Sequence, residues 1–243
     1  MKKVSIILIL ILFAACASKA PPFDSAATFG KGDELMKEGS FDDARKEYQK
    51  IQEKSPDKAY DPVLMLRIAD TYFGEKKYSE AQVEYQAFLN YHPVHRDAPY
   101  AQYQMAMCSF KELTSIDRDP TPNHIVIREM RKLKDRYPKS SYVQEADHYI
   151  VLCLDRLAQY EFYVIKFYFK KDAYKAVAGR CEKLLKTYPG SSVEKDAIYY
   201  AGLSYQELGE VDQARVKFET LAERYPDMKQ TALAHLHKLE KKP

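Results

Sequence analysis

The sequence predicts an all-α protein, a superhelix of five helix-turn-helix repeats of which the central two are irregular. Three observations predict this fold. Prolines recur along the chain after an aromatic or polar residue, small and aromatic residues stand at equal distances before several of them, and short turn sequences recur between apolar segments. Internal periodicity of this kind decides the fold before any single motif does.

A segment typical of a signal peptide precedes the repeats. Residues 1–3 are Met-Lys-Lys, and residues 4–13 are apolar apart from Ser5. The apolar run is too short to cross a bilayer as a helix, which requires roughly 20 residues. A short basic start followed by an apolar run of this length is a secretory signal. We therefore expect residues 1–15 to be removed from the mature protein.

The residues around the cleavage site resemble those of bacterial lipoproteins. Two alanines directly precede Cys16, although Phe13 stands where such signals usually have leucine. The resemblance implies that Cys16 is acylated and that residues 16–24 form a lipidated linker; several acyl chains make a stable anchor. Ala17 replaces the aspartate that retains lipoproteins at the inner membrane of enteric-type bacteria, which favours the periplasmic face of the outer membrane. Ordinary cleavage beside an incidental cysteine is the alternative.

Charge and cysteine spacing exclude several classes of protein. The 38 Lys and Arg nearly balance the 35 Asp and Glu, and their signs are interspersed, so no basic surface for nucleic acid is expected. Cys108, Cys153 and Cys181 are widely spaced and form no C-x-x-C pair. Each lies in an apolar helical pattern. These three cysteines are predicted to be buried small hydrophobic residues rather than disulfide partners or metal ligands.

Five prolines define the length of the repeat. Pro56, Pro93, Pro138, Pro189 and Pro226 are separated by 37, 45, 51 and 37 residues. Tetratricopeptide repeats have a period of about 34 residues. The two outer spacings fit this period with short linkers, whereas the two central spacings require insertions.

Three of the repeats share small and aromatic residues at packing positions. An alanine stands twelve residues before the proline, an aromatic residue eight before it and an apolar residue five before it. The small residue allows the second helix to approach the first closely, and the aromatic residue fills the gap on the same face. Ala69 and Gly202 are the matching small residues of the first helices. The repeated positions are Ala44, Ala81 and Ala214, then Tyr48, Tyr85 and Phe218, then Ile51, Phe88 and Leu221.

The turns between the helices carry helix-end signals. Gly39 and Gly209 suit the left-handed residue that ends many helices. Ser79, with Gln82 three residues later, predicts a capping box at the start of a second helix.

The extra residues of the two central repeats are predicted to form a loop in one repeat and a longer helix in the other. Residues 114–122 are too rich in proline for the interior of a helix and predict a surface loop. In the fourth repeat, apolar and aromatic residues at three and four spacing predict one long helix over about residues 144–170. The aromatic content of residues 160–169 would also suit a strand. The helical period continues through the segment, so we expect a helix.

The sequence contains no local signature of an active site. It lacks the G-x-S-x-G, H-E-x-x-H and glycine-rich phosphate-loop patterns. The close histidine pairs, His92 with His95 and His235 with His237, adjoin a repeat-ending proline or lie on the expected last helix. We therefore predict a non-enzymatic protein without a cofactor or metal ion.

Repeat superhelices bind extended segments of other proteins on the concave face lined by their first helices. An arginine beside aromatic residues on this face would suit a terminal carboxylate and a neighbouring aromatic side chain. Packing against adjacent repeats is the alternative role for the same positions. The candidates are Arg67, Asp70 and Phe73 in repeat two and Tyr103, Gln104 and Met107 in repeat three.

Several segments of the mature chain together resemble the BamD family of outer-membrane β-barrel assembly lipoproteins. The resemblance covers nearly the whole mature chain and includes both central irregularities. The segments are His92-Pro93, residues 100–103, 117–120, 155–161 with Val164 and Tyr168, 173–177 with Arg180, 188–189 and 195–197.

The resemblance implies two binding halves. Residues 25–141, repeats one to three, would receive the C-terminal targeting signal of unfolded outer-membrane proteins. Residues 142–243, repeats four and five with a tail helix, would dock on a periplasmic domain of the barrel subunit BamA, beside other lipoproteins of the machine. The family often has arginine at position 195, and the lysine found here lacks its bidentate fork. The implied docking residues are Asp155, Arg156, Arg180, Lys195 and Asp196.

Two other functions are weighed against this one. A different periplasmic repeat lipoprotein, such as a pilus-secretin pilotin or a cell-division coordinator, would have the same anchor and repeats. An enzyme or an enzyme-activating subunit is disfavoured because the chemistry of a site is missing from the sequence.

Overall fold

The computed structural model describes residues 23–55 and 60–240, which form eleven α-helices and no strand. Cys16 and the predicted signal peptide lie outside the described residues. Five helices are the first of a pair: α1 (Ser25–Glu38), α3 (Asp61–Gly74), α5 (Ala98–Lys111), α7 (Val143–Phe169) and α9 (Glu194–Leu208). Their partners are α2 (Phe41–Lys54), α4 (Tyr78–Tyr91), α6 (Thr121–Arg136), α8 (Tyr174–Thr187) and α10 (Val211–Arg224), and α11 (Lys229–Glu240) follows the last pair.

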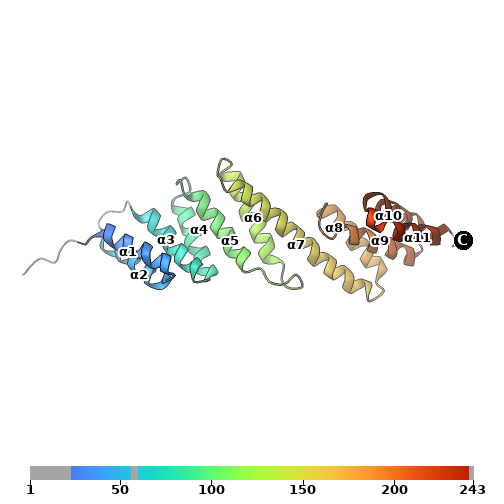
Figure 1. Ribbon diagram of the computed structural model, residues 1–243, viewed down its shortest axis with the longest axis horizontal. Coiled ribbons are helices and arrows are strands. Elements are labelled where there is room, and N and C mark those ends of the chain that lie inside the picture. Colours follow the sequence, from blue (N-terminus) through green and yellow to red (C-terminus); the bar gives the residue numbers. More distant parts are fainter. Residues whose placement is uncertain (1–22, 56–59, 241–243) are drawn as a thin grey trace, which may run out of the picture.

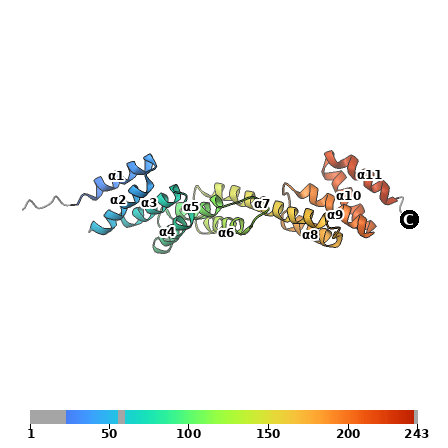
Figure 2. The same ribbon diagram turned by 90° about the horizontal axis from the view of Figure 1, so that it is seen from below.

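The helices are arranged in chain order along one long axis. Each packs mainly against the helix before it and the helix after it, and the two ends of the described chain lie at opposite ends of the molecule (Figures 1 and 2). This arrangement is that of a repeat protein, in which each repeat contacts only its neighbours. The predicted all-α repeat superhelix is confirmed.

The repeated small and aromatic residues form the core between helices. The three alanines, the three aromatic residues and the three apolar residues of repeats one, two and five are all fully buried. A Cβ atom on Gly202 would lie 2.8 Å from the Phe218 ring, so this position of α9 admits only glycine without movement of the ring. Gly32 has the same relation to Tyr48 in repeat one, at 2.5 Å. Close helix approach therefore depends on small residues facing aromatic ones.

The turns agree with the sequence at two positions and differ at a third. Gly39 and Gly209 end their helices in the left-handed conformation, with φ of 78° and 73°, as predicted. The predicted capping box at Ser79 is wrong, because α4 begins one residue earlier at Tyr78 and has no side-chain cap. The Ser79 hydroxyl lies 3.4 Å from Glu112 instead. Lys76 has a φ of 61° and takes the left-handed position of this turn.

The inserted loop of repeat three ends slightly earlier than the sequence suggests. Helix α6 begins at Thr121, and Pro122 lies in its first turn, where a missing backbone N–H costs no helical hydrogen bond. The Asp119 carboxylate accepts hydrogen bonds from the Thr121 backbone N–H at 3.0 Å and from its hydroxyl at 2.7 Å.

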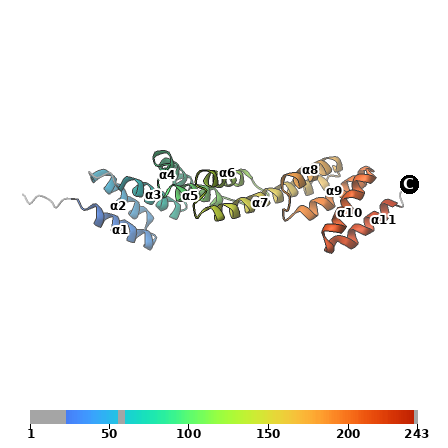
Figure 3. The same cartoon turned by 90° about the horizontal axis from the view of Figure 1, so that it is seen from above.

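Helix α7 connects the N-terminal repeats to the C-terminal repeats. It has 27 residues, as the continuous helical period predicts. Ala146, Cys153 and Leu157 in its first part pack with residues of α5 and α6, whereas Phe162 and Ile165 pack with α8 and α9. Figures 1 and 3 show α7 crossing the middle of the molecule between α6 and α8. A single helix thus belongs to two successive hydrophobic clusters.

The described cysteines are buried, free thiols, as the sequence predicts. Burial raises the pKa of Cys108 and Cys181 to about 12 and that of Cys153 to about 11. A thiol with such a pKa stays protonated at neutral pH and is a poor nucleophile. These cysteines therefore serve packing.

Candidate functional site

The candidate residues fall in two regions, repeats one to three and repeats four and five, and the first region is built mainly on the first helices of its repeats. At its centre, Asp70 of α3 accepts hydrogen bonds from the Tyr85 hydroxyl at 2.6 Å and the Tyr100 hydroxyl at 2.7 Å, both on Oδ1. The Gln104 side-chain amide donates to the Tyr100 hydroxyl at 3.0 Å. One carboxylate therefore joins helices α3, α4 and α5.

Arg67 extends these contacts to repeat one. Its guanidinium lies 3.1 Å from Asp33 of α1 and 3.5 Å from Asp70, and the Tyr48 hydroxyl donates to Asp33 at 2.7 Å. Only 11% of the Asp70 side chain is exposed, and burial raises its pKa above the ordinary value, although the two tyrosine hydroxyls and Arg67 act in the opposite direction. We name these connected residues the Asp70 network: Asp33, Tyr48, Arg67, Asp70, Tyr85, Tyr100 and Gln104.

The charge of Arg67 is already balanced inside the protein. Two carboxylates, Asp33 and Asp70, lie within ion-pair distance of its guanidinium. A substrate carboxylate would have to displace one of them. The contacts of Arg67 therefore disfavour the expectation that it holds a terminal carboxylate.

Partly buried tyrosines adjoin the Asp70 network. The Tyr103 ring of α5 stacks on Tyr142 with a centroid distance of 4.9 Å and an interplanar angle of 25°. Tyr149 of α7 lies 6.2 Å from Tyr103, and Tyr100 lies 6.2 Å from Tyr142. We call Tyr100, Tyr103, Tyr142 and Tyr149 the tyrosine cluster. Their rings have fixed neighbours and partly exposed surfaces, which suits contact with a partner side chain at low entropic cost.

The remaining two candidates of this half lie deeper. Met107 is only 6% exposed within the cluster formed by α5, α6 and α7, so it offers almost no surface to a peptide. Phe73 is partly buried and makes an edge contact with Tyr78 at 5.4 Å. The structure therefore brings Arg67, Asp70, Gln104 and Tyr103 together on one surface and places Met107 in the core.

Sequence reasoning missed several members of this surface. Asp33 and Tyr100 stand 37 and 30 residues from Asp70, in other repeats, and Tyr142 immediately precedes α7. The one available signal was the seven-residue spacing of Tyr142 and Tyr149, which places both rings on one side of a helix.

The candidate docking residues of the second half do not form one site. Asp155 of α7 accepts hydrogen bonds from the Ser192 backbone N–H at 2.7 Å and its hydroxyl at 2.9 Å, which fixes the loop before α9. Arg156 donates to the Thr114 carbonyl of the inserted loop. Arg180 of α8 lies 3.4 Å from Glu161 and 5.0 Å above the Tyr168 ring.

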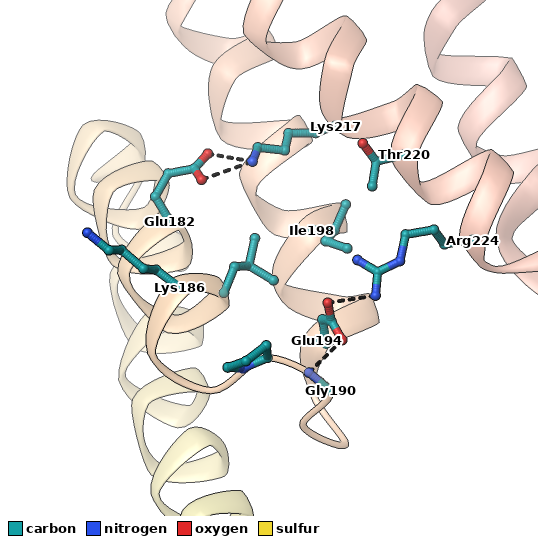
Figure 4. A pocket seen from close by; sticks show the side chains of 10 residues that line it. Glu182, Lys186, Gly190, Glu194, Ile198, Lys217, Thr220 and Arg224 are labelled. Carbon is teal, nitrogen blue, oxygen red and sulfur yellow. Dashed lines mark hydrogen bonds and ion pairs between the residues drawn. The ribbon is translucent and has the colours of Figure 1, made fainter.

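The start of α9 carries two adjacent ion pairs. Lys195 lies 2.5 Å from Asp227, and the buried Glu194 pairs with Arg224 at 2.9 Å and accepts the Gly190 backbone N–H at 2.9 Å. Figure 4 shows Glu194 between Gly190 and Arg224 at one side of a hollow of about 550 Å³ lined by α8, α9 and α10. Sequence reasoning missed Glu194 and Arg224.

Lys195 and Asp196 therefore lie at the start of α9, directly after the loop that Asp155 fixes. Asp196 lies in the first turn of α9 and is partly exposed. Arg156 contacts the inserted loop of repeat three, and Arg180 contacts the C-terminal part of α7. The docking candidates thus divide between the α9 start and two separate positions.

Two further properties bear on the class of protein. Within residues 23–55 and 60–240, no three metal-binding side chains gather where they could hold an ion. No helix in this described part is both long enough and apolar enough to span a membrane.

The fold and these surfaces define a tetratricopeptide-type repeat protein. The chain belongs to the YfiO family of outer membrane lipoproteins, whose sequence model matches residues 23–221. It is similar to the outer membrane protein assembly factor BamD of Xylella fastidiosa strain 9a5c, with 28% identity over 214 residues, 83% of this chain and 73% of that protein. The BamD of Rickettsia prowazekii is 26% identical over 235 residues, 95% of this chain and 94% of the relative. The resemblance to the BamD family is confirmed.

Among solved structures, the TPR2AB domain of yeast Sti1 in complex with pHSP90 is a match to this chain. It has a TM-score of 0.49 and 13% sequence identity, and the match covers 89% of this chain and 83% of that one.

Proposed function

We propose that this chain is a non-enzymatic outer-membrane protein assembly factor, anchored through Cys16 to the periplasmic face of the outer membrane. It binds targeting segments of unfolded β-barrel proteins through repeats one to three and docks on the barrel subunit BamA, near other lipoproteins of the machine, through repeats four and five. The family match and the relatives named as assembly factor BamD support the general role. The role requires no cofactor.

The main support for the proposed substrate binding is the tyrosine cluster beside the Asp70 network. Tyr103 and Tyr142 present stacked, partly exposed rings, and Tyr100 links them to the buried Asp70 carboxylate. Rigid aromatic side chains lose little conformational freedom on binding. An extended segment that carries an aromatic residue fits such a surface.

The α9 start supports partner docking. Lys195 is partly exposed, with 35% of its side chain accessible, and its charge is shared with the exposed Asp227. A surface ion pair of this kind contributes little to stability, so a partner carboxylate can replace Asp227 at small cost. The buried Glu194 carboxylate, paired with the half-exposed Arg224, keeps α9 in place next to it. BamA is therefore proposed to bind here through an acidic residue.

Binding assays with the full chain, purified in detergent, test both parts of the proposal. We expect it to bind a periplasmic fragment of BamA and a peptide that ends in an aromatic residue. The absence of both interactions would refute the proposed function. Photocrosslinking in cells from Tyr103 and Lys195 provides the second test, and capture of a secretin in place of BamA would instead support the pilotin alternative.

Charge reversal at Lys195 is expected to weaken docking selectively. The variant Lys195→Glu repels the proposed partner carboxylate and should lower affinity for the BamA fragment at least about tenfold, or about 1.4 kcal/mol. Lys195→Arg keeps the charge and should retain binding. Lys183→Glu, an exposed charge reversal on α8, is the matched control. Titration by fluorescence anisotropy measures these affinities, and equal affinities for Lys195→Glu and Lys183→Glu would contradict docking at the α9 start.

A further inference from the structure

A second hollow adjoins the tyrosine cluster at the edge of repeats two and three. It has a volume of about 700 Å³ and lies between the start of α5 and the turn that joins α6 to α7. Its aromatic and proline walls are formed by Tyr100, Tyr137, Tyr142, Pro99 and Pro138. Tyr100 and Tyr142 also belong to the tyrosine cluster, so the hollow and that cluster form one continuous surface.

Positive charge gathers around this hollow. Arg96, Arg136 and Lys139 line it together with a single carboxylate, Asp97. Asp97 is already engaged, because the Arg96 guanidinium lies 3.4 Å from it. Arg136 and Lys139 are exposed and have no ion-pair partner among the residues that the structure describes. The hollow therefore keeps two cationic side chains that can bind an anion.

The backbone adds to this preference. The hollow opens between the N-terminal ends of α5 and α7, helices of 14 and 27 residues. The N-terminal end of a helix carries partial positive charge from its unpaired N–H groups. The N-terminal end of α7 and two unpaired cations thus adjoin one volume whose walls include tyrosine rings.

We propose that this hollow receives the C-terminal carboxylate of a bound targeting segment, and that an aromatic side chain of the same segment packs on Tyr100 and Tyr142. Arg136 and Lys139 bind the carboxylate in place of Arg67, whose charge Asp33 and Asp70 already balance. The inference rests on the proposed substrate binding and assigns its charged end to specific residues. The segment then runs from the hollow along the tyrosine cluster.

Two peptides test the assignment by their difference in affinity. A ten-residue peptide that ends in phenylalanine is prepared with a free carboxylate and as the C-terminal amide, and each is titrated against the full chain in detergent. We expect the free acid to bind about tenfold more tightly, because charge-assisted hydrogen bonds to arginine are stronger than neutral ones. The double variant Arg136→Gln with Lys139→Gln should lose this preference and bind the amide as the unchanged chain does.

A matched double variant controls for net charge. Lys183→Gln with Arg215→Gln removes two exposed cations from α8 and α10, far along the chain from the hollow, and should keep the tenfold preference. Circular dichroism checks that both double variants remain folded. If the Arg136→Gln, Lys139→Gln variant retains the preference while binding both peptides, the assignment is wrong and the proposed function stands. If the unchanged chain binds neither peptide, both the assignment and the proposed substrate binding fail.

A third peptide distinguishes a chain terminus from an acidic side chain. It carries an aspartate before the final phenylalanine and is amidated at its C-terminus. We expect it to bind no more tightly than the plain amide. If this peptide binds as tightly as the free acid, and the Arg136→Gln, Lys139→Gln variant loses that affinity, the hollow binds acidic side chains as well. The assignment to a terminal carboxylate would then be wrong.

Discussion

The variant Asp70→Ala is expected to destabilise the N-terminal half by about 3 kcal/mol. The alanine removes the acceptor of two tyrosine hydroxyls and one of the two carboxylates that hold Arg67. Tyr85 is fully buried, so its hydroxyl finds no water in exchange. Leaving a buried donor without a partner costs the desolvation of that group.

The variant Asp70→Asn separates the hydrogen bonds from the charge. Both tyrosine hydroxyls donate to the same oxygen of Asp70, and an asparagine oxygen at that position can accept both. We expect this variant to cost less than about 1 kcal/mol near pH 7, because the weakened contact with Arg67 is offset by the smaller desolvation of a neutral amide.

The stability of the unchanged chain and that of Asp70→Asn should also depend differently on pH. Burial raises the pKa of Asp70 in the folded state above the unfolded value, so the folded protein binds the proton first as the pH falls. The unchanged chain therefore gains stability relative to Asp70→Asn between pH 7 and about pH 4, close to the unfolded pKa. The opposite trend would mean that Arg67 and the hydroxyls outweigh burial.

Hydrogen exchange locates the effect of Asp70 in the chain. Urea titration gives the free energy of unfolding, and amide exchange followed by mass spectrometry reports protection separately for each helix. Protection should fall in α3, α4 and α5 of Asp70→Ala and remain unchanged in α9 and α10, because repeats couple through their neighbours. Uniform loss of protection over all helices would contradict this local role.

The variant Ala158→Pro is expected to have the largest effect of any single change in α7. Ala158 is fully buried in the middle of the helix, between the cluster that contains Leu157 and the one that contains Phe162. Proline there removes a helical hydrogen bond and clashes with the preceding turn, at a cost of about 3 kcal/mol or more. We expect amide protection to be lost through α7, α8 and the start of α9, while α3 and α4 keep theirs.

The chain itself supplies the control for this proline. Pro62, Pro99 and Pro122 each occupy the second position of their helix, and Gln144 occupies the same position of α7. Gln144→Pro should therefore be tolerated, because the first turn has unpaired N–H groups. Equal loss of stability in Gln144→Pro and Ala158→Pro would show that the middle of α7 has no special importance.

The core of the regular repeats was predictable from the sequence because these repeats place small and aromatic residues at the same spacing. Ala81 and Tyr85 occupy the core for the reason that Ala214 and Phe218 do. The long α7 was predictable because its helical period continues without interruption. The start of α4 was not, since the competition between Ser79 and Tyr78 for the first turn depends on contacts outside that turn.

The candidate surfaces were only partly predictable for a related reason. Periodicity shows which side of its own helix Asp70 occupies, but the rotation of one helix against the next decides which residues meet it. The contacts come from different helices. Asp33 and Tyr100 lie on other helices than Arg67 and Asp70, and Asp227 lies outside the helix of Lys195. These contacts depend on the superhelical arrangement and appear only in three dimensions.

The length of α7 also determines how two binding events can influence each other. At 1.5 Å per residue, its 27 residues span about 40 Å. A protein that holds an unfolded segment near the start of this helix and a partner beyond its end keeps both at one fixed separation. A segment long enough to bridge this distance meets the partner at a local concentration that the stiff helix sets, rather than at its concentration free in solution. Lengthening or bending α7 would change this local concentration without altering either binding surface.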